Sequence, residues 1–595
     1  MSKILMPTWS IRRCLGLLSI FALLVLAPLS AQTTTGTITG TVVDPSNNVI
    51  PTAKVTVTNE ATGDVRRAES TGSGDFSFPS LLPATYTLQV EMAGFQTYKS
   101  SGNVLTPNGR LALGELRLVV GSVAETIEVA AQAAQVATQS GENSALITRD
   151  QFSMIPTKGR DLTNMLRLLP GVQMTQDTEA FGGATGFGAT MGAVQGTRSA
   201  QQNLTVDGIT ANDLGAPAGL SGQLNMDAVQ EVKVLLSNYQ AEYGRNPGAN
   251  ISMTTRSGTK EFHGSAYYYF RNESLNANDF FRNKSTDPRI SSKPAVYRFN
   301  TMGVTLGGPV MEIPKINPGR DKLFFFYSFD NTVNRIPDGN FTRNFMPTAL
   351  ERAGDFSQSI TKPKDPTTGQ AFPNNQIPLN RFSSMAPLLN LYPLPNAPDL
   401  VALSLGNYEF LRVQKIPNFQ HVFRIDYRIS SKDSLYVRGA IWRKDTYGPG
   451  GTVGYGTSIN WPFLESHYQY GDDSLAVNYT HIWTPTIISE FTAGARHNTE
   501  NENKDDFDAV AKKGTRKGVG LASLGYIFGG PNDNVFDLIP NITYPGFNAA
   551  PGVGFGTRFG LAGYDTVFNV THATTFILSK HTVKAGIYWN RSLNT

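Results

Sequence analysis

An alternation of apolar and polar side chains begins at Phe262, and it constrains the fold of this chain more than any other feature. In residues 422–429 one strand face is apolar and the opposite face is mostly charged. The apolar set is Phe423, Ile425, Tyr427 and Ile429, and the opposite set is Val422, Arg424, Asp426 and Arg428. Because successive side chains of a β-strand point to opposite faces, this pattern predicts a strand with one apolar face. Related segments lie at 299–306, 322–330, 435–442, 475–496 and 567–589.

Tight turns and long loops join these segments alternately. The turns fall at 430–433, 484–486 and 580–581. Residues 331–419 are expected to form a nearly structureless loop. Strands of about ten residues joined in this way are typical of transmembrane β-barrels, because a bilayer offers no hydrogen-bond partners. The alternative interpretation is a soluble protein built from several β-sandwiches, in which strands also alternate.

Composition supports a β-rich membrane chain. Glycine and aromatic residues are abundant, with 57 Gly, 34 Phe and 22 Tyr, whereas only 16% of the residues are charged. Aromatic residues near the strand ends are expected to form an interfacial girdle. They lie at 267–270, 324–326 and 442. No apolar run of transmembrane-helix length follows residue 31, so any membrane span must consist of strands. A net charge of +4 is too small to indicate binding to nucleic acid.

A glycine-dense segment of mixed α/β character, residues 155–258, precedes the alternating region. A helix is expected over residues 161–169, with Asp161 as its N-cap. Its apolar face consists of Leu162, Met165, Leu166 and Leu169. The dipeptide Asp207-Gly208 predicts a tight hairpin turn. Short strands are expected at 204–206, 231–235 and 251–255, and glycine-rich loops at 181–192 and 241–249.

Four strings occur in order along this region. They are IPTKGRDLTNMLRLLPGV (155–172), GTRSAQQNLTVDGI (196–209), AEYGRNPGANISMTTRSGT (241–259) and FHGSAYYYFRNESLNANDFF (262–281). Together they resemble the plug and first barrel strand of TonB-dependent outer-membrane receptors, in the Oar-like branch of that family. The resemblance implies a plug domain at residues 140–259 and a transmembrane β-barrel in residues 260–595.

About nine strands can be read after residue 260, whereas plugged outer-membrane transporters have 22 strands and single-chain bacterial barrels have an even number. Residues 260–595 are also few for a full-size barrel with long loops. We therefore expect this sequence to be a C-terminally truncated fragment of a longer receptor.

Residues 1–31 have the features of a cleaved secretion signal. Basic residues precede an almost wholly apolar run at 14–27, and small residues lead to a cut ahead of Gln32. Cys14 is the only cysteine of the chain, so the mature chain would have none. This excludes a disulfide framework and a cysteine-ligated metal.

Residues 32–121 consist of short β-prone runs separated by turn-forming residues. The runs fall at 38–43, 53–58, 76–78, 86–92 and 111–120. Their spacing predicts a small β-sandwich, with a bulge near Gly114 where the alternation slips. The strings GTITGTVVDPSNNVIPTAKVTVTN and GDFSFPSLLPATYTLQVEMAGFQ resemble the carboxypeptidase-regulatory-like domain, whose fold is classed with carbohydrate-binding-like sandwiches. The resemblance implies a structural or docking module without peptidase activity, and sugar binding is the alternative.

Residues 122–139 are interpreted as a linker that contains an extended, β-branched segment. The segment is Glu125, Thr126, Ile127, Glu128 and Val129, followed by two alanines. Such a segment can add to the sheet edge of a partner through main-chain hydrogen bonds. It resembles the TonB box, which implies a TonB-type energy-coupling protein as its periplasmic partner. The alternative is that it forms the last strand of the sandwich or a simple linker.

The resemblance also implies charged contacts between the plug and the barrel wall. The plug residues expected to make them are Arg160, Arg198, Asp207, Glu231, Glu242, Arg245 and Arg256. The alternative is that these side chains are solvated. No catalytic, cofactor or metal site is expected, because the seven histidines are scattered singly and no known catalytic motif occurs.

The predicted fold is mostly β, with an N-terminal β-sandwich, a small α/β plug domain and an antiparallel transmembrane β-barrel that is incomplete in this chain. The predicted function is that of a non-enzymatic outer-membrane receptor that binds an extracellular ligand and imports it, or moves a polypeptide, with energy coupled from the inner membrane. Its expected partners are the TonB-type protein, outer-membrane lipid and that ligand, for which carbohydrate is one candidate. The sandwich is expected in the periplasm. The alternative is a surface adhesin or carbohydrate-binding scaffold without active transport.

Overall fold

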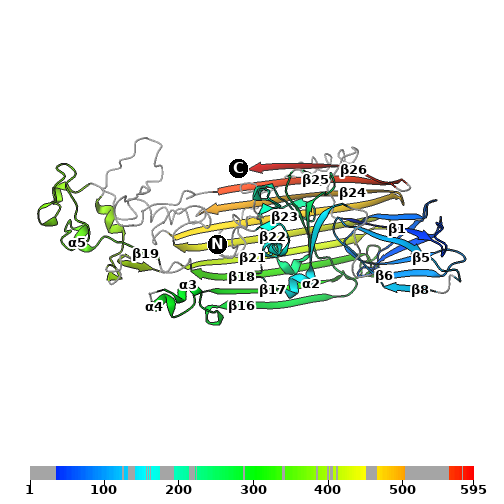
Figure 1. Cartoon of the computed structure of the whole chain (residues 1–595), viewed down its shortest axis with the longest axis horizontal. Helices are drawn as coiled ribbons and strands as arrows, with labels where there is room; N and C mark the ends of the chain where they lie inside the picture. The colour runs from blue at the N-terminus through cyan, green and yellow to red at the C-terminus, as the bar shows by residue number, and fades with distance from the viewer. Residues whose placement is uncertain are drawn as a thin grey trace.

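The computed structural model describes residues 35–122, 126–130, 141–155, 157, 160, 162–173, 193–213, 221–222, 224–244, 246–285, 288–295, 297–337, 342–383, 386–398, 401, 406–410, 413–449, 465–502, 562–578 and 581–594. The expected secretion signal at 1–31 and the glycine-rich loop at 181–192 lie outside these residues. Three parts follow one another along the chain, and Figure 1 shows the N-terminal part at one end of a sheet of long strands.

The N-terminal part consists of two β-sheets that pack together. The first has the order β4-β1-β7, with β1 (Gly36–Val43), β4 (Asp75–Leu81) and β7 (Arg110–Arg117). The second has the order β3-β2-β5-β6-β8, with β2 (Lys54–Asn59), β3 (Val65–Glu69), β5 (Ala84–Glu91), β6 (Thr97–Leu105) and β8 (Thr126–Ala130). Alternate residues such as Val55, Val57 and Leu88 are buried between the sheets. The strands β3 and β6 are not expected from the sequence.

The predicted bulge near Gly114 is confirmed by the pairing of β1 with β7. Thr39 pairs with Ala112 but Thr41 pairs with Glu115, so β7 contains one extra residue at this point. Gly114 has φ +68°, which a residue without a Cβ adopts at little cost.

The plug contains a five-stranded sheet of order β13-β12-β15-β14-β9. Its strands are β9 (Asn143–Thr148), β12 (Asn203–Val206), β13 (Ile209–Thr210), β14 (Val229–Ser237) and β15 (Asn250–Thr255). Smaller elements are α2 (Arg149–Met154), β10 (Val172–Gln173), β11 (Ala193–Val194) and the 3₁₀ helices η4 (Ser199–Gln201) and η5 (Met226–Ala228). The helix expected at 161–169 is a 3₁₀ helix, η2 (Leu162–Leu168), which buries Leu162, Met165 and Leu166. Its expected N-cap, Asp161, lies outside the described residues.

The third part is an antiparallel sheet of nine strands in sequence order, within the described residues. The strands are β16 (His263–Asn272), β17 (Arg298–Pro309), β18 (Leu323–Pro337), β21 (Val413–Arg428), β22 (Asp433–Pro449), β23 (Glu465–Thr484), β24 (Ile487–Glu502), β25 (Ala562–Leu578) and β26 (His581–Asn594). We call this sheet the wall. The turns predicted at 430–433 and 484–486 join neighbouring strands of the wall and are confirmed by the pairing on either side of them. Residue 580 of the turn predicted at 580–581 lies outside the described residues.

The wall has the two-faced character that the alternation predicts. Apolar side chains such as Ile425 and Leu475 are 44% and 46% exposed on the outer face. The inner face is buried against the plug, and wall residues Phe326, Val422 and Ala440 belong to the same apolar cluster as the plug core. The plug is therefore packed against the inner face of the wall.

The expected outer girdle is wrong at three of its residues. Phe324, Phe326 and Trp442 do not belong to it, because all three lie on the inner face and are at most 4% exposed. Trp442 instead clusters with Tyr468 and Tyr470. The physical reason is strand parity, which places every second aromatic residue inside a wall that the plug fills.

The long connections are also more ordered than expected. The connection between β18 and β21 contains β19 (Thr342–Asn344), β20 (Tyr408–Phe410), α5 (Ala349–Arg352) and the 3₁₀ helices η7 (Pro373–Asn375), η8 (Leu379–Arg381) and η9 (Ala386–Leu391). The connection between β16 and β17 contains η6 (Glu273–Leu275), α3 (Phe280–Asn283) and α4 (Pro288–Ser291). Figure 1 shows α5 and β19 beyond the end of the wall that is remote from the sandwich. No helix among the described residues is long and apolar enough to cross a membrane.

Candidate functional site

The tip of the plug hairpin β12–β13 is a deeply buried contact between plug and wall. Asp207 and Gly208 both have positive φ, +49° and +81°, which confirms the predicted tight turn. The Asp207 carboxylate accepts hydrogen bonds from the Thr255 amide at 3.0 Å and from the Thr255 hydroxyl at 2.7 Å. The turn is thereby held to β15 while its carboxylate faces the wall.

Two wall arginines meet the Asp207 carboxylate. Arg438 donates through Nε to Asp207 at 2.9 Å and through Nη2 to the Val206 carbonyl at 2.8 Å. Arg424 has its Nη1 atom 3.6 Å from Asp207 and donates through Nη2 to Asp426 at 2.8 Å. Asp207, Arg424 and Arg438 are each at most 4% exposed. Because two carboxylates face two guanidinium groups, the buried charges are balanced.

The other side of the hairpin is held by neutral groups and one further arginine. Arg496 of β24 donates to the Thr210 carbonyl at 3.2 Å. Asn569 of β25 accepts from the Thr210 amide at 3.3 Å, and the hydroxyls of Thr210 and Tyr588 lie 2.9 Å apart. The hairpin therefore contacts strands β21, β22, β24, β25 and β26.

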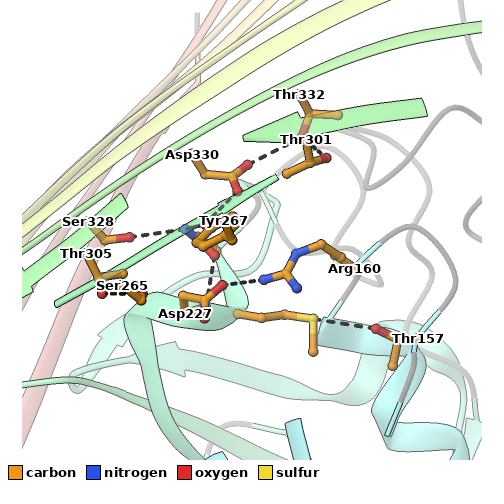
Figure 2. A network of polar contacts seen from close by, with 12 residues as sticks. Thr157, Arg160, Asp227, Ser265, Tyr267, Thr301, Thr305, Ser328, Asp330 and Thr332 are labelled. Atoms are coloured by element: carbon orange, nitrogen blue, oxygen red, sulfur yellow. Dashed lines mark hydrogen bonds and ion pairs between the residues drawn. The ribbon is translucent and has the colours of Figure 1, made fainter. Parts of the chain in front are cut away.

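A second polar network joins η5 of the plug to the first wall strands (Figure 2). Asn225 donates to the Tyr267 hydroxyl at 2.9 Å and to the Ser328 hydroxyl at 3.1 Å. The Tyr267 hydroxyl in turn donates to Asp330 at 2.9 Å. Figure 2 shows Arg160 beside Asp227, its ion-pair partner within the plug.

The remaining charged plug residues from the sequence analysis have different surroundings. The Arg160 guanidinium lies 4.3 Å from the Tyr269 ring centroid, and that of Arg256 lies 4.8 Å from the Phe326 ring centroid. Glu242 forms an ion pair of 2.7 Å with Lys584 of β26. Arg198 is exposed, and Arg245 lies outside the described residues.

Glu231 differs from these residues, because it faces a cavity rather than the wall. It is 7% exposed and lines a cavity of about 600 Å³ between sandwich, plug and wall. Burial raises the pKa of Glu231 from 4.5 to about 8, and the charge of Lys233 opposes this rise. Burial also lowers the pKa of Arg256 to about 10, and the nearby charge of Arg149 lowers it further.

The segment that resembles a TonB box lies in the sandwich. Thr126–Ala130 forms β8, which pairs in parallel with β6 in the register Thr126 to Thr97 and Glu128 to Lys99. Glu128 forms an ion pair with Lys99, and that hydrogen bond lowers the pKa of Glu128. Ile127 is paired with Tyr98. Glu125 lies outside the described residues, and only the backbone of Val129 is described.

The sandwich also contacts the wall directly. Glu490 of β24 is 2% exposed and accepts hydrogen bonds from the hydroxyls of Thr35 and Ser80, the latter at 2.9 Å. Arg428 of β21 forms an ion pair of 3.2 Å with Asp64. These contacts attach the sandwich to the end of the wall that carries the tight turns (Figure 1).

Sequence reasoning does not identify the wall partners of the plug. The alternation predicts that Arg424 and Arg438 share the polar face, but it does not predict that Asp207 lies between them. A usable signal exists, since the inward arginines Arg424 and Arg438 are register partners on β21 and β22, and Asp426 lies beside Arg424 on β21. Balancing the charge of the second arginine then requires a carboxylate from another part of the chain. Among the described residues, no group of three or more His, Cys, Asp or Glu side chains could hold a metal ion.

Comparisons with known families assign each part of the chain. The outer membrane beta barrel domain matches residues 254–595, the TonB-dependent receptor plug domain matches residues 136–250, and the carboxypeptidase regulatory-like domain matches residues 37–119. The TonB-dependent transporter Oar from Myxococcus xanthus is 29% identical over 358 residues, which are 57% of this chain and 30% of that protein. The chain thus spans less than a third of the length of that relative.

Solved structures of outer-membrane proteins are also similar. The siderophore receptor PirA from Acinetobacter baumannii has a TM-score of 0.42 and 12% identity, over 76% of this chain and 48% of that chain. The outer membrane transporter YddB from Escherichia coli has a TM-score of 0.41 and 12% identity, over 76% of this chain and 47% of that chain. From the family matches we conclude that the chain belongs to the outer membrane β-barrel family, as a TonB-dependent receptor with a plug domain and an N-terminal carboxypeptidase regulatory-like domain.

Proposed function

We propose that this chain acts in TonB-dependent transport, binding an extracellular ligand and moving it across the outer membrane past the plug. The observation that carries the proposal is the buried contact between Asp207 and Arg438, which holds a separate domain inside the wall. A path for the ligand opens only when this contact breaks or shifts. Because polar partners can be exchanged for water as the plug moves, such a contact is reversible.

The orientation in the membrane follows from the connections of the wall. Outer-membrane barrels have short periplasmic turns and longer extracellular loops. The sandwich lies at the end with the turns at 430–433 and 484–486, so we place it in the periplasm. The connection that contains α5 and β19 then faces the cell exterior and belongs to the ligand-binding surface.

The energy-coupling partner is proposed to bind at β8. Within the described residues, β8 is the edge strand of its sheet, and its only strand neighbour there is β6. An edge strand presents main-chain donors and acceptors, to which a strand of a TonB-type protein can add. Its place in the sheet thus makes β8 accessible to a partner strand without unfolding of the sandwich.

We assign the sandwich a docking role rather than sugar binding. Its described contacts include the wall, where Ser80 binds Glu490 and Asp64 binds Arg428, and the plug, where Lys233 donates to the Asn108 carbonyl. A domain that is fixed at the periplasmic end can transmit a pulling force applied at β8 to the plug and the wall. This assignment is tested by adding glycans to the full-length protein, where calorimetric binding to the sandwich would contradict it.

The test of the coupling proposal uses the full-length protein and the purified periplasmic domain of a TonB-type protein. Replacing Thr126–Ala130 by a Gly-Ser sequence of equal length removes the β-branched side chains that stabilise an extended strand. Binding measured by calorimetry should weaken by about tenfold or more. The control replaces the exposed turn at 45–48 in the same domain and should bind normally. Equal binding by both variants would exclude β8 as the coupling site.

A further inference from the structure

The cavity of about 600 Å³ lies where the three parts of the chain meet, and its size is that of a site for a small organic molecule. The sandwich contributes an apolar rim that includes Leu81, Leu82 and Pro83. The plug contributes charged groups from β14, from the start of α2 and from the residues after β15. The wall contributes β18 and β21 to β23.

Most charged groups around the cavity already have partners. Arg424 is paired with Asp426 and Asp207, and Arg428 is paired with Asp64 and Asp321. These groups are therefore occupied by contacts within the protein.

Three charged plug residues on the cavity wall are not compensated in this way. Glu231 is 7% exposed, and its side chain has no hydrogen bond or ion pair within the described residues. The Nη1 atom of Arg149 is buried and has no hydrogen-bond partner there either. Within the described residues, the Arg256 guanidinium contacts the Phe326 ring and the Asp227 carbonyl. Unpaired buried donors of this kind are costly unless a ligand or water satisfies them.

The charges define the class of ligand. Five arginines and five acidic residues line the cavity. Burial raises the pKa of Glu231 to about 8, so at neutral pH this carboxyl is protonated and can donate a hydrogen bond. One positive charge is then in excess, which favours a ligand with a single negative charge. An apolar rim beside two guanidinium groups suits a carboxylate that carries an apolar body.

We propose that this cavity binds a small organic monocarboxylate, with the carboxylate at Arg149 and Arg256 beside Glu231 and the apolar body against Leu81 and Leu82. The site lies on the sandwich side of the plug. It is separate from β8, which does not line the cavity, so failure of this site leaves the coupling proposal untouched.

The experiment measures binding of N-acetyl-leucyl-phenylalanine to the full-length protein by equilibrium dialysis. This probe has one carboxylate and two apolar side chains, and its C-terminal amide is the neutral control. We expect the acid to bind and the amide to bind about tenfold more weakly or worse, since charge-assisted hydrogen bonds are lost. Absence of binding by the acid, or equal binding of acid and amide, would overturn the proposal.

Variants then locate the site. Arg149→Gln should weaken binding of the acid by about tenfold or more, because it removes the charge that faces the carboxylate. Glu231→Gln should preserve binding, because the amide of glutamine also donates. Arg198→Gln is the matched control, since Arg198 is an exposed plug arginine outside the cavity lining. Unchanged binding by Arg149→Gln would show that the probe binds elsewhere.

Discussion

The Nε atom of Arg438 on the wall donates to Asp207 of the plug at 2.9 Å, and both side chains are 1% exposed. The two residues are 231 positions apart in the sequence. A charge pair so deeply buried is stable only while both partners are present, because each charge has lost its hydration. The contact therefore makes the position of the plug sensitive to a single residue.

Removing the Asp207 carboxylate should loosen the plug. Asp207→Ala leaves Arg438 without its buried counter-charge, and the expected cost is about 3–5 kcal/mol. Asp207→Asn should cost less, because asparagine still accepts hydrogen bonds and tolerates the positive φ of this turn. The measurement is the urea concentration at which a protease cleaves the plug of the full-length protein. Asp150→Ala, at an exposed plug position, is the control, and equal midpoints for all variants would contradict the prediction.

The ion pair between Glu242 and Lys584 should contribute more modestly. The two side chains are 15% and 26% exposed, so solvent screens their attraction in part. A double-mutant cycle with Glu242→Ala and Lys584→Ala should give a coupling energy of about 1 kcal/mol. The same protease assay supplies the four stabilities. Strictly additive effects would mean that the pair does not couple plug and wall.

Locking β8 into the sandwich distinguishes two modes of partner binding. Lys99 and Glu128 are register partners, and neighbouring strands lie about 4.8 Å apart, which is within disulfide range. If the partner strand adds to the outer edge of β8, the oxidised Lys99→Cys, Glu128→Cys protein should bind the TonB-type domain as well as the reduced protein does. Binding that appears only after reduction would show instead that β8 must leave the sheet. The single-cysteine variants control for loss of the Lys99–Glu128 ion pair.

Glu231 should make stability fall as pH rises. The pKa of Glu231 is about 8 in the folded protein and about 4.5 in the unfolded chain. Between these two pH values the folded state keeps a proton on Glu231 that the unfolded state releases. The resulting stability is fully present below about pH 4.5 and is lost as pH rises through about 8, at up to about 1.4 kcal/mol per pH unit. Glu231→Gln cannot titrate. Between about pH 5 and about pH 9, the melting temperature of the wild type should therefore fall more than that of the variant; parallel curves would contradict the assigned pKa.

The alternation after Phe262 predicts much of the wall, because strand geometry alone decides which face a side chain occupies. Ile425 points outward and Arg424 inward, as their positions require. The Asp207-Gly208 turn is predicted for the same kind of local reason. The girdle prediction fails at Trp442, because the sequence pattern around a tryptophan does not show whether lipid or the plug covers its face of the strand.

The sequence by itself determined the strands, the two-faced wall, the plug hairpin and the family of the chain, since each depends on short-range patterns of residue type. Only the tertiary structure decided that Asp207 meets Arg438 and that Glu242 meets Lys584. It also decided that Thr126–Ala130 joins the sandwich sheet and that Glu231 faces a cavity. These outcomes depend on the relative orientation of separate domains, and no short-range periodicity in the sequence encodes that orientation.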